Sequence, residues 1–264
     1  MRVTSLASGS SGNAFLVEAG STRVLIDAGI TLAGIGSGLA HYGLTPADLS
    51  CVLLTHEHSD HLCSARSLSR RYFLPLAATA GTLSHLAAHK GEQMRLVPGV
   101  GFALDGLAIT PFSIPHDGLE PVGYLLEHEG TRACLATDLG HVPEELLSVF
   151  RSCDLLILEA NHDEDRLWCG PYPRPLKRRV AAPTGHLSNE QTAECLVKVG
   201  DGGPRWVWLA HLSSTNNSPR CALETVSARL NREQIGGMQV GVALRDRPSL
   251  RWDSAEAFCQ GKLL

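Results

Sequence analysis

Short apolar runs recur along the chain between clusters of turn-forming residues, a pattern typical of β-strands. The first two runs, residues 14–18 and 22–27, flank a turn that contains Gly20, which predicts a β-hairpin. The run at residues 51–54 is apolar throughout, as expected of a strand that is buried on both faces. The same pattern predicts further strands at residues 107–112, 122–127, 133–137, 155–159 and 206–210.

Helical signals lie between these strands. Residues 30–42 are followed by Gly43, which favours the end of a helix there. Residues 143–152 begin with a proline and two glutamates, which suit the first turn of a helix. Residues 189–199 open with polar residues and then place apolar side chains at helical spacing. Two groups of strands with interspersed helices predict an α/β fold of two stacked sheets flanked by helices, as one domain over residues 1–264.

Composition narrows the class of protein. With 264 residues, of which 44% are hydrophobic, the chain can build a substantial core. It contains no apolar run of about 18 residues, so we expect no membrane association through a spanning helix. Eight cysteines are scattered without a C-x-x-C pair, which favours reduced thiols in a cytoplasmic protein. The net charge of −4 argues against a generally basic coat for nucleic acid, but it permits a local basic patch.

The strongest chemical signal is an H-x-H-x-D-H run directly after an apolar strand, formed by His56, His58, Asp60 and His61. Imidazole nitrogens and carboxylate oxygens are ligands that Zn²⁺ and Mn²⁺ accept. In an extended backbone, residues two apart project to the same side, so His56 and His58 can hold one ion together. The following turn directs Asp60 and His61 towards a second ion. Burying four such residues with nothing to bind is costly, which favours a metal site over a solvated polar loop.

Three later strands also end in ligand-type residues. His116 follows the strand that begins at residue 107, Asp138 follows residues 133–137, and His211 follows residues 206–210. Strand ends on a rigid scaffold are a usual place for functional side chains. Taken alone, each of these residues is better explained by a structural role. Together they complete the ligand set that the H-x-H-x-D-H run begins.

Together these residues resemble the metallo-β-lactamase superfamily, in which the H-x-H-x-D-H motif is followed by His, Asp and His at later strand ends. The resemblance implies a four-layer αββα sandwich over nearly the whole chain and two divalent ions, Zn²⁺ or Mn²⁺. One ion is expected to bind His56, His58 and His116, and the other Asp60, His61 and His211, with Asp138 bridging both. Asp27 resembles the family's aspartate that orients the metal loop, and the alternative is a turn aspartate that caps Gly29.

A closer resemblance is to the WalJ (YycJ) branch of that superfamily. Its stretches appear here as L-A-S-G-S-S-G-N at residues 6–13, E-A-N-H-D at 159–163, G-H-L-S-N-E at 185–190 and A-H-L-S at 210–213. This resemblance implies a cytoplasmic, metal-dependent nuclease with 5′→3′ exonuclease action on DNA. The segments of Glu159 and His186 also resemble paired segments of ribonuclease Z, where the histidine donates a proton. No counterpart of its tRNA-clamping arm is visible, which weakens tRNA processing as the role.

The chemistry of such a site suits a phosphodiester. Two divalent ions, partly neutralised by carboxylates and a bridging hydroxide, keep a net positive charge that attracts an anion. The bridging hydroxide would attack phosphorus in line. The leaving sugar alkoxide needs a proton, and His186, oriented by Glu159, is the candidate donor beside the catalytic Asp60 loop. Alternatively, His186 is only a neighbour of a helix N-cap at Ser188 or Asn189.

Two further segments are candidate contacts for a nucleic acid substrate. The residues between Glu159 and His186 include prolines, and among them we single out two aromatic residues and a group of cations, namely Trp168, Tyr172, Arg174, Lys177, Arg178 and Arg179. Such cations can contact phosphates and such aromatics can stack on bases, and the alternative is an irregular surface loop with solvated charges. The Gly- and Ser-rich segment 8–13, with Ser10 and Asn13, suits a phosphate-binding loop or a tight turn between strands.

Other functions fit part of this pattern. A hydrolase of a small ester, a thioester, a lactone or a cyclic phosphodiester needs the same metal site but no donor for a sugar alkoxide. A tRNA-processing endoribonuclease also remains open. A nucleic-acid-binding protein with a decayed site would lack a ligand, and here none is missing. The Glu159 and His186 pair and the basic segment favour a nuclease, whereas the metal, the choice between DNA and RNA, and the oligomeric state stay open.

Overall fold

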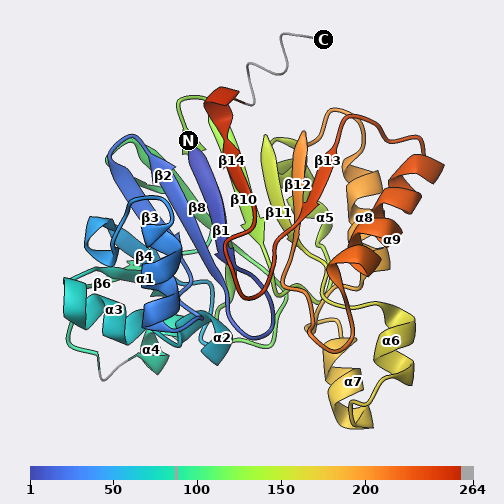
Figure 1. The fold of residues 1–264 in the computed structure, drawn as a ribbon, viewed down its shortest axis with the longest axis horizontal. Coiled ribbons are helices and arrows are strands. Elements are labelled where there is room, and N and C mark those ends of the chain that lie inside the picture. The colour runs from blue at the N-terminus through green and yellow to red at the C-terminus, as the bar shows by residue number, and fades with distance from the viewer. Residues whose placement is uncertain (87–88, 257–264) are drawn as a thin grey trace.

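The computed structural model describes residues 1–86 and 89–256, whose strands form two sheets (Figure 1). The first sheet contains, in spatial order, β14 (Arg251–Asp253), β1 (Arg2–Ala7), β2 (Ala14–Ala19), β3 (Thr22–Ile26), β4 (Cys51–Leu53), β5 (Leu76–Thr79) and β6 (Gln93–Leu96). The second contains β13 (Gln239–Val242), β12 (Trp206–Ala210), β11 (Leu155–Glu159), β10 (Thr131–Ala136), β9 (Val122–His128), β8 (Leu107–Ser113) and β7 (Phe102–Leu104).

Helices cover the outer faces of both sheets. The first sheet is covered by α1 (Leu32–Ala40), α3 (Ala65–Tyr72) and α4 (Ala80–His85), seen on the left of Figure 1. The second is covered by α5 (Glu144–Arg151), α8 (Asn189–Val199) and α9 (Pro219–Arg232), seen on the right. Three short helices lie along the lower edge, namely α2 (Ser59–Leu62), α6 (Glu164–Cys169) and α7 (Arg174–Val180). A 3₁₀ turn, η1 (Pro46–Asp48), precedes β4.

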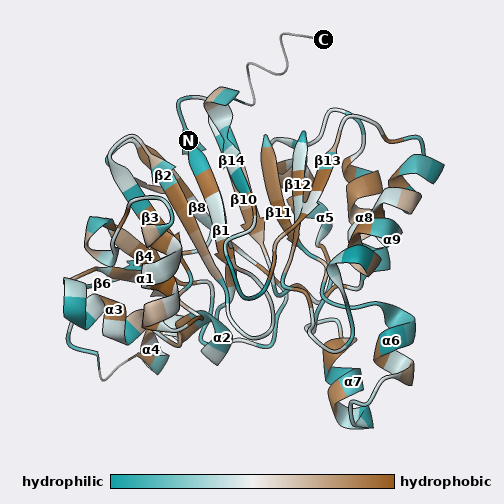
Figure 2. Ribbon diagram, in the orientation of Figure 1, coloured by the Kyte–Doolittle hydropathy of each residue, from teal (hydrophilic) through white to brown (hydrophobic). Residues whose placement is uncertain are grey.

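Successive side chains of a strand point to opposite faces of its sheet, and this alternation explains the layers. Phe15 of β2 packs into a core cluster shared with Tyr124 of the second sheet, whereas its neighbour Leu16 packs into the cluster under α1 and α3. In β11, Ile157 faces the shared core and Leu158 faces the cluster under α5, α8 and α9. Both faces of the central strands are therefore apolar, as the brown strands in Figure 2 show. The predicted four-layer αββα sandwich is confirmed.

Parallel pairing brings the functional strand ends to one edge. The strands β3, β4, β5 and β6 pair in parallel, as do β10, β11, β12 and β13. The strand β8 pairs antiparallel with β9, which pairs antiparallel with β10, so β8 and β10 end on the same side. Ligands of α/β sheets usually bind outside the carboxyl ends of parallel strands. Here these ends from both sheets meet at the lower edge in Figure 1.

Most of the predicted elements are confirmed. The hairpin corresponds to the antiparallel pair β2 and β3, and the predictions for residues 155–159, 189–199 and 206–210 match β11, α8 and β12. The helix expected over residues 30–42 is shorter, because its first turn begins after the Thr31 N-cap and His41 caps its end. The alternative of an irregular loop between Glu159 and His186 is wrong, because that segment contains α6 and α7.

The structure also bears on what the sequence predicts about membrane-spanning helices, cysteines and domain organisation. Among the described residues, no helix is long and apolar enough to cross a membrane. The seven cysteines that the structure describes are free thiols. The central core cluster draws residues from both sheets, for example Val17 and Leu135, which supports the proposal that residues 1–264 form a single domain.

Candidate metal centre

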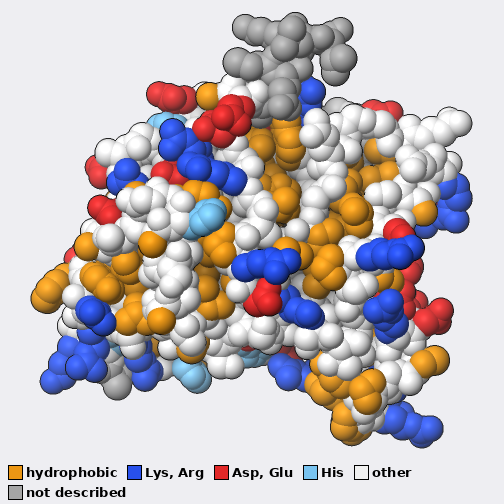
Figure 3. Space-filling model, viewed as in Figure 1, with side chains coloured by type: hydrophobic (Ala, Val, Ile, Leu, Met, Phe, Trp, Pro, Cys, Tyr) orange, Lys and Arg blue, Asp and Glu red, His pale blue; other side chains and the backbone are white. Residues whose placement is uncertain are grey.

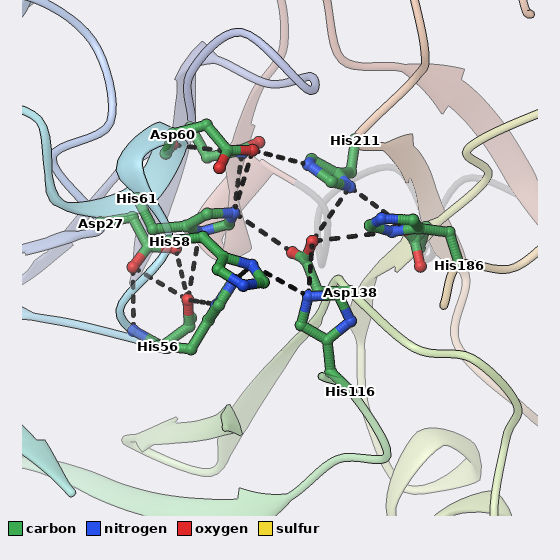
Figure 4. Close-up of polar contacts among 12 residues, drawn as sticks. Asp27, His56, His58, Asp60, His61, His116, Asp138, His186 and His211 are labelled. Carbon is green, nitrogen blue, oxygen red and sulfur yellow. Dashed lines mark hydrogen bonds and ion pairs between the residues drawn. The ribbon is translucent and has the colours of Figure 1, made fainter. Parts of the chain in front are cut away.

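Four ligand-type residues enter the centre from one tight turn after β4. His56 and His58 lie in the connection from β4 to α2, and Asp60 and His61 lie in the single turn of α2 itself. His58 is the N-cap of this helix and has an extended backbone. The change from extended to helical backbone separates the two pairs of side chains. Figure 4 shows all four directed towards residues that arrive from the second sheet.

Six ligand-type residues fall into two compact groups. Within each group all ligand atoms lie within 4.8 Å of one another: His56, His58 and His116 form one, and Asp60, His61 and His211 form the other. Nδ1 of His58 lies 2.9 Å from Nε2 of His56 and 3.2 Å from Nε2 of His116. Zinc bonds of about 2.0–2.1 Å in a tetrahedral site place ligand nitrogens roughly 3.3 Å apart. The three imidazoles therefore converge at the spacing that one ion requires.

Asp138 lies between the two groups. Its Oδ2 is 3.3 Å from Nε2 of His61, and its Oδ1 is 3.4 Å from Nδ1 of His211 and 3.8 Å from Nε2 of His116. The side chain is buried, and Oδ2 makes no hydrogen bond to any described residue. A buried carboxylate oxygen without a hydrogen bond is costly unless a cation satisfies it. The donor set and this oxygen together fit divalent cations.

Three residues at strand ends adopt a left-handed backbone that non-glycine residues rarely use. Asp27 after β3 has φ 61°, Asp138 after β10 has φ 63°, and His211 after β12 has φ 56°. The left-handed turn redirects each side chain from the strand axis into the centre. Such conformations are unfavourable for residues with a Cβ and gather at functional sites. The occurrence of three such residues at one edge supports the functional interpretation of the side chains.

Glu159 links the second ligand group to His186. The side chain is fully buried, and its Oε1 accepts hydrogen bonds from Nδ1 of His186 at 2.8 Å and Nδ1 of His211 at 2.7 Å. Its Oε2 accepts from the backbone N–H groups of Leu139 and Leu187. A carboxylate that accepts from Nδ1 fixes the histidine tautomer and leaves Nε2 for an ion or substrate. One carboxylate thus orients both imidazoles.

On the first sheet, Asp27 orients the imidazole of His61 as Glu159 orients that of His211. Its Oδ2 lies 2.7 Å from Nδ1 of His61, and its Oδ1 accepts from the backbone N–H and the hydroxyl of Thr55. Nε2 of His61 is thereby directed towards Asp138. The alternative role of Asp27 as a cap of Gly29 is not seen, because the Gly29 N–H donates to the carbonyl of Asn13.

The charges of the centre favour cations. Burial lowers the pKa of His56 and of His116, so both present neutral nitrogens. Burial also disfavours a charge on His211, but Asp138, with Asp60 and Glu159, outweighs it and raises the pKa of His211 to about 10. Without ions, these carboxylates retain protons on histidine, and ions that bind there would displace those protons.

The basic segment divides into exposed and buried cations. Arg174 and Arg178 are exposed on α7, and Nε of Arg179 contacts Oδ2 of Asp117 at 2.6 Å. Lys177 is buried, and its Nζ donates to the carbonyls of Trp168 and Gly170 at the end of α6. The ammonium group of Lys177 is therefore occupied within the arm formed by α6 and α7, which argues against the predicted contact with the substrate.

The segment 8–13 is the turn between β1 and β2, as one of the two alternatives predicted. Ser10 is exposed on it, whereas Asn13 is buried. The Asn13 N–H donates to the carbonyl of Asp60 at 2.9 Å, its Oδ1 accepts from the Gly9 N–H, and its Nδ2 lies 3.2 Å from Nε2 of His61. Asn13 thus holds the metal loop in place, and its contact with the substrate stays a prediction.

Two residues of the site were not anticipated from the sequence. Asp117 lies 3.3 Å from Nε2 of His116 and 3.7 Å from Nε2 of His58, and it joins them to Arg179. Thr55 orients Asp27 through its hydroxyl. Both residues are direct sequence neighbours of predicted ligands, and this position was the one sign in the sequence that they belong to the site. Their partners come from distant segments, and no local pattern reveals those.

Comparisons with known proteins agree with this geometry. A family model described as "Beta-lactamase superfamily domain" matches residues 22–212. The chain is 33% identical over 238 residues to "Exodeoxyribonuclease WalJ" of Streptococcus pneumoniae, with 88% of each chain covered. It is 32% identical over 236 residues to "Exodeoxyribonuclease YycJ" of Bacillus anthracis, with 88% of this chain and 89% of that protein covered.

A solved structure shares the fold at low identity. Zn²⁺-bound PqqB from Methylobacterium extorquens superposes with a TM-score of 0.72 at 18% identity, over 96% of this chain and 100% of that chain. Such a likeness concerns the fold, whereas the family model and the two relatives above also match in sequence. The chain therefore belongs to the β-lactamase superfamily, with the WalJ and YycJ exodeoxyribonucleases among its relatives.

Proposed function

We propose that the chain is a phosphodiesterase with two divalent metal ions that degrades DNA from the 5′ end. The observation that carries the proposal is the shared carboxylate of Glu159, which contacts the proposed metal ligand His211 and the proposed proton donor His186. A hydrolase of thioesters or lactones has no need for such a donor. The names of the two relatives support DNA as the substrate. The free cysteines support a cytoplasmic location as part of the same proposal.

The ligand groups are proposed to hold one ion each. His56, His58 and His116 present three nitrogens to the first, and Asp60, His61 and His211 surround the second, with Asp138 shared between them. Zn²⁺ and Mn²⁺ both accept this donor set. When bound, the ions supply an acidified water as nucleophile and positive charge for the phosphate oxygens.

His186 is proposed to donate the proton that the leaving alkoxide requires. Its ring lies 5.1 Å from that of His116 and 5.3 Å from that of His211, measured between centroids, so it borders both ligand groups. Burial disfavours its charged form, but the Glu159 carboxylate outweighs burial and raises the pKa of His186. Because Nδ1 donates to Glu159, Nε2 carries the proton that can pass to the substrate.

Substrate binding is proposed along the lower edge, which is hollowed beside α7 in Figure 3. Arg179 borders the centre through Asp117, and Arg174 and Arg178 lie on the same helix further out. Ser10 is exposed on the turn whose residue Asn13 touches the metal loop. Cations in this position attract the phosphodiester backbone in a manner that salt weakens.

The test is degradation of single- and double-stranded DNA and RNA that carry a label at one end, with Mn²⁺ or Zn²⁺. A 5′→3′ exonuclease releases a 5′ label at once as a mononucleotide, whereas a 3′ label passes through a ladder of shortening strands. A chelator and Asp60→Asn should each abolish the reaction. Asp165→Asn, which changes an exposed aspartate of α6, is the matched control and should leave it intact.

The same assay can contradict the proposal in distinct ways. Immediate release of the 3′ label would reverse the polarity. Internal cuts would indicate an endonuclease, and preference for RNA would change the substrate. Hydrolysis of a small ester or cyclic phosphodiester, with every polymer left intact, would replace the nuclease by one of the other hydrolases that this metal site permits.

A further inference from the structure

A second cationic region lies away from the α6–α7 arm, between α3 and β6. It is a pocket of about 820 Å³ lined by Arg66, Ser69, Arg70, Phe73, His89, Lys90, Gly91 and Glu92. In Figures 1 and 3, α3 lies at the lower left, where lysine and arginine side chains gather on the surface. The arm formed by α6 and α7 lies at the lower right, so the metal centre is flanked on both sides.

The lining of this pocket is positively charged, whereas the whole chain has a net negative charge. The chain has 23 lysines and arginines against 27 acidic residues. The pocket lining instead combines three cations with one acidic residue, Glu92. Within the part of the chain that the structure describes, Arg66, Arg70 and Lys90 form no ion pair with a carboxylate, and Nη2 of Arg66 donates to the carbonyl of His85 at 2.7 Å. An uncompensated group of cations attracts a polyanion.

Phe73 is an aromatic residue in an unusual position. Its side chain is 90% exposed, more than any other large hydrophobic residue described. It also has φ 57° at the C-cap of α3, where glycine is the usual residue. Neither burial nor backbone preference accounts for phenylalanine here. An exposed ring beside cations is the combination with which proteins stack unpaired bases while holding the phosphates.

The pocket wall is already fixed in place. The hydroxyl of Ser69 donates to the carbonyl of Leu74 at 2.6 Å and lies 2.9 Å from Nε2 of His89. Since its hydrogen is used on Leu74, the hydroxyl accepts the N–H of His89. A side chain at Gly91 would collide with the His89 ring, so glycine permits this close packing. A preformed wall reduces the ordering cost of binding a ligand.

The pocket is connected to the metal loop through α3, and it extends towards the amino ends of β5 and β6. The turn that carries Asp60 and His61 leads directly into α3, and Ser64 at its start donates to the carbonyls of Ala28 and Ile30. Arg66 lies in the first turn of α3 and Phe73 at its far end. At about 1.5 Å per residue, this helix spans roughly 12 Å. A single strand that leaves the centre would have to follow α3 over this length to reach Phe73.

We propose that the pocket between α3 and β6 binds single-stranded DNA that extends from the metal centre, with Phe73 stacked on a base and Arg66, Arg70 and Lys90 beside phosphates. This inference rests on the proposed nuclease function and adds a binding site to it. Duplex DNA is disfavoured as the occupant, because its paired bases have no free face for Phe73. The site serves long substrates, since a single small diester bound at the metal centre does not reach it.

The first test measures binding without catalysis. Affinity for a fluorescent oligothymidylate is determined in excess chelator over a range of salt concentrations. Phe73→Ala should weaken binding by roughly 5- to 100-fold, whereas Phe73→Tyr should retain it. Arg70→Glu combined with Lys90→Glu should reduce the slope of log affinity against log salt by about 1.4. Val100→Ala, at another exposed hydrophobic residue, and Arg220→Glu on α9 are the matched controls.

The second test separates this site from the metal centre. With metal present, the same variants should raise KM for long DNA and leave hydrolysis of bis(4-nitrophenyl) phosphate unchanged, which also shows that they fold. Unchanged binding and unchanged KM in the Phe73→Ala and charge-reversal variants would overturn the pocket as a DNA site. Displacement of the oligonucleotide from the pocket by low concentrations of orthophosphate would also overturn it, in favour of a small-anion site. Failure of the wild-type chain to cleave any diester would instead refute the proposed function, since the binding test needs no catalysis.

Discussion

The first sheet supplies its part of the metal centre from one short turn, whereas the second sheet supplies single residues from separate strand ends. His56, His58, Asp60 and His61 lie within six positions after β4. His116, Asp138, Glu159 and His211 each follow or end a different strand. The first half is a local structure whose members share one backbone turn. The second half exists only because parallel strands end at the same edge, so its geometry depends on the whole sheet.

The largest effect is expected at Asp138, where the two halves meet. Asp138→Asn keeps a residue type that tolerates φ 63° but removes the negative charge between the ligand groups. Nuclease activity should fall to background, and the metal content should drop from two ions per chain. Elemental analysis with an activity assay provides the measurement. Full activity with two bound ions in the variant would mean that Asp138 does not join the halves.

His186 should separate proton donation from metal chemistry. His186→Ala should slow cleavage of a natural diester by about 10²- to 10⁴-fold, because an alkoxide then leaves without a proton. Cleavage of a diester with a nitrophenolate leaving group should change little, since that group needs no proton. The control is His141→Ala, an exposed histidine of the same region whose Nδ1 lies 2.9 Å from the carbonyl of Pro183. Equal losses on both substrates would exclude His186 as the acid.

Replacing the two orienting carboxylates, Asp27 and Glu159, should have different effects on metal binding and on proton donation. Asp27→Asn disturbs His61 and Thr55 but has no contact with His186, so it should weaken metal binding by roughly 10- to 100-fold and slow both diester substrates alike. Glu159→Gln disturbs His211 and His186 together, so it should add a selective loss on the natural diester. Titration of each variant with metal, followed by the ratio of the two rates at saturating metal, tests this contrast. Identical rate ratios in the two variants would contradict it.

The arm formed by α6 and α7 should show a smaller effect that depends on salt. Charge reversal at Arg178 and Arg179 removes two proposed phosphate contacts, so the slope of log affinity against log salt should fall by about 1.4 for single strands. Binding titrations at several salt concentrations provide the measurement. An unchanged slope would mean that these arginines do not face the substrate.

A variant of Lys177, in the same helix, should change stability and leave substrate binding unchanged. Lys177→Met removes an ammonium group that donates to two carbonyls at the end of α6. It should lower the free energy of unfolding by about 1–3 kcal/mol, since hydrogen bonds from a charged donor to two carbonyls are lost. The salt slope should stay the same. Denaturant unfolding and the same binding titrations test both statements, and a flatter slope would return Lys177 to the substrate contacts.

The sequence reveals this centre where its signals are local. The H-x-H-x-D-H turn, and apolar runs that end in His116, Asp138 and His211, are visible without a fold, and the sandwich follows from the two strand groups. The role of Asn13 is hidden, because its partners Asp60 and His61 lie more than forty positions away. Lys177 is hidden for a related reason. A lysine in a cationic run is expected in solvent, but Lys177 is buried and its Nζ donates to two carbonyls at the end of α6.

The left-handed backbone at Asp27, Asp138 and His211 has a consequence for how such a chain can change over time. Glycine adopts this conformation freely, while a residue with a Cβ does so at a cost of roughly 1–2 kcal/mol. Mutation of Asp138 to glycine would relax the backbone and remove a buried carboxylate oxygen that has no hydrogen bond to a described residue, whereas at Asp27 and His211 it would also remove buried hydrogen bonds. At Asp138, loss of function is therefore expected to accompany a gain in fold stability, and a descendant that no longer needs catalysis is expected to accumulate glycine at this position.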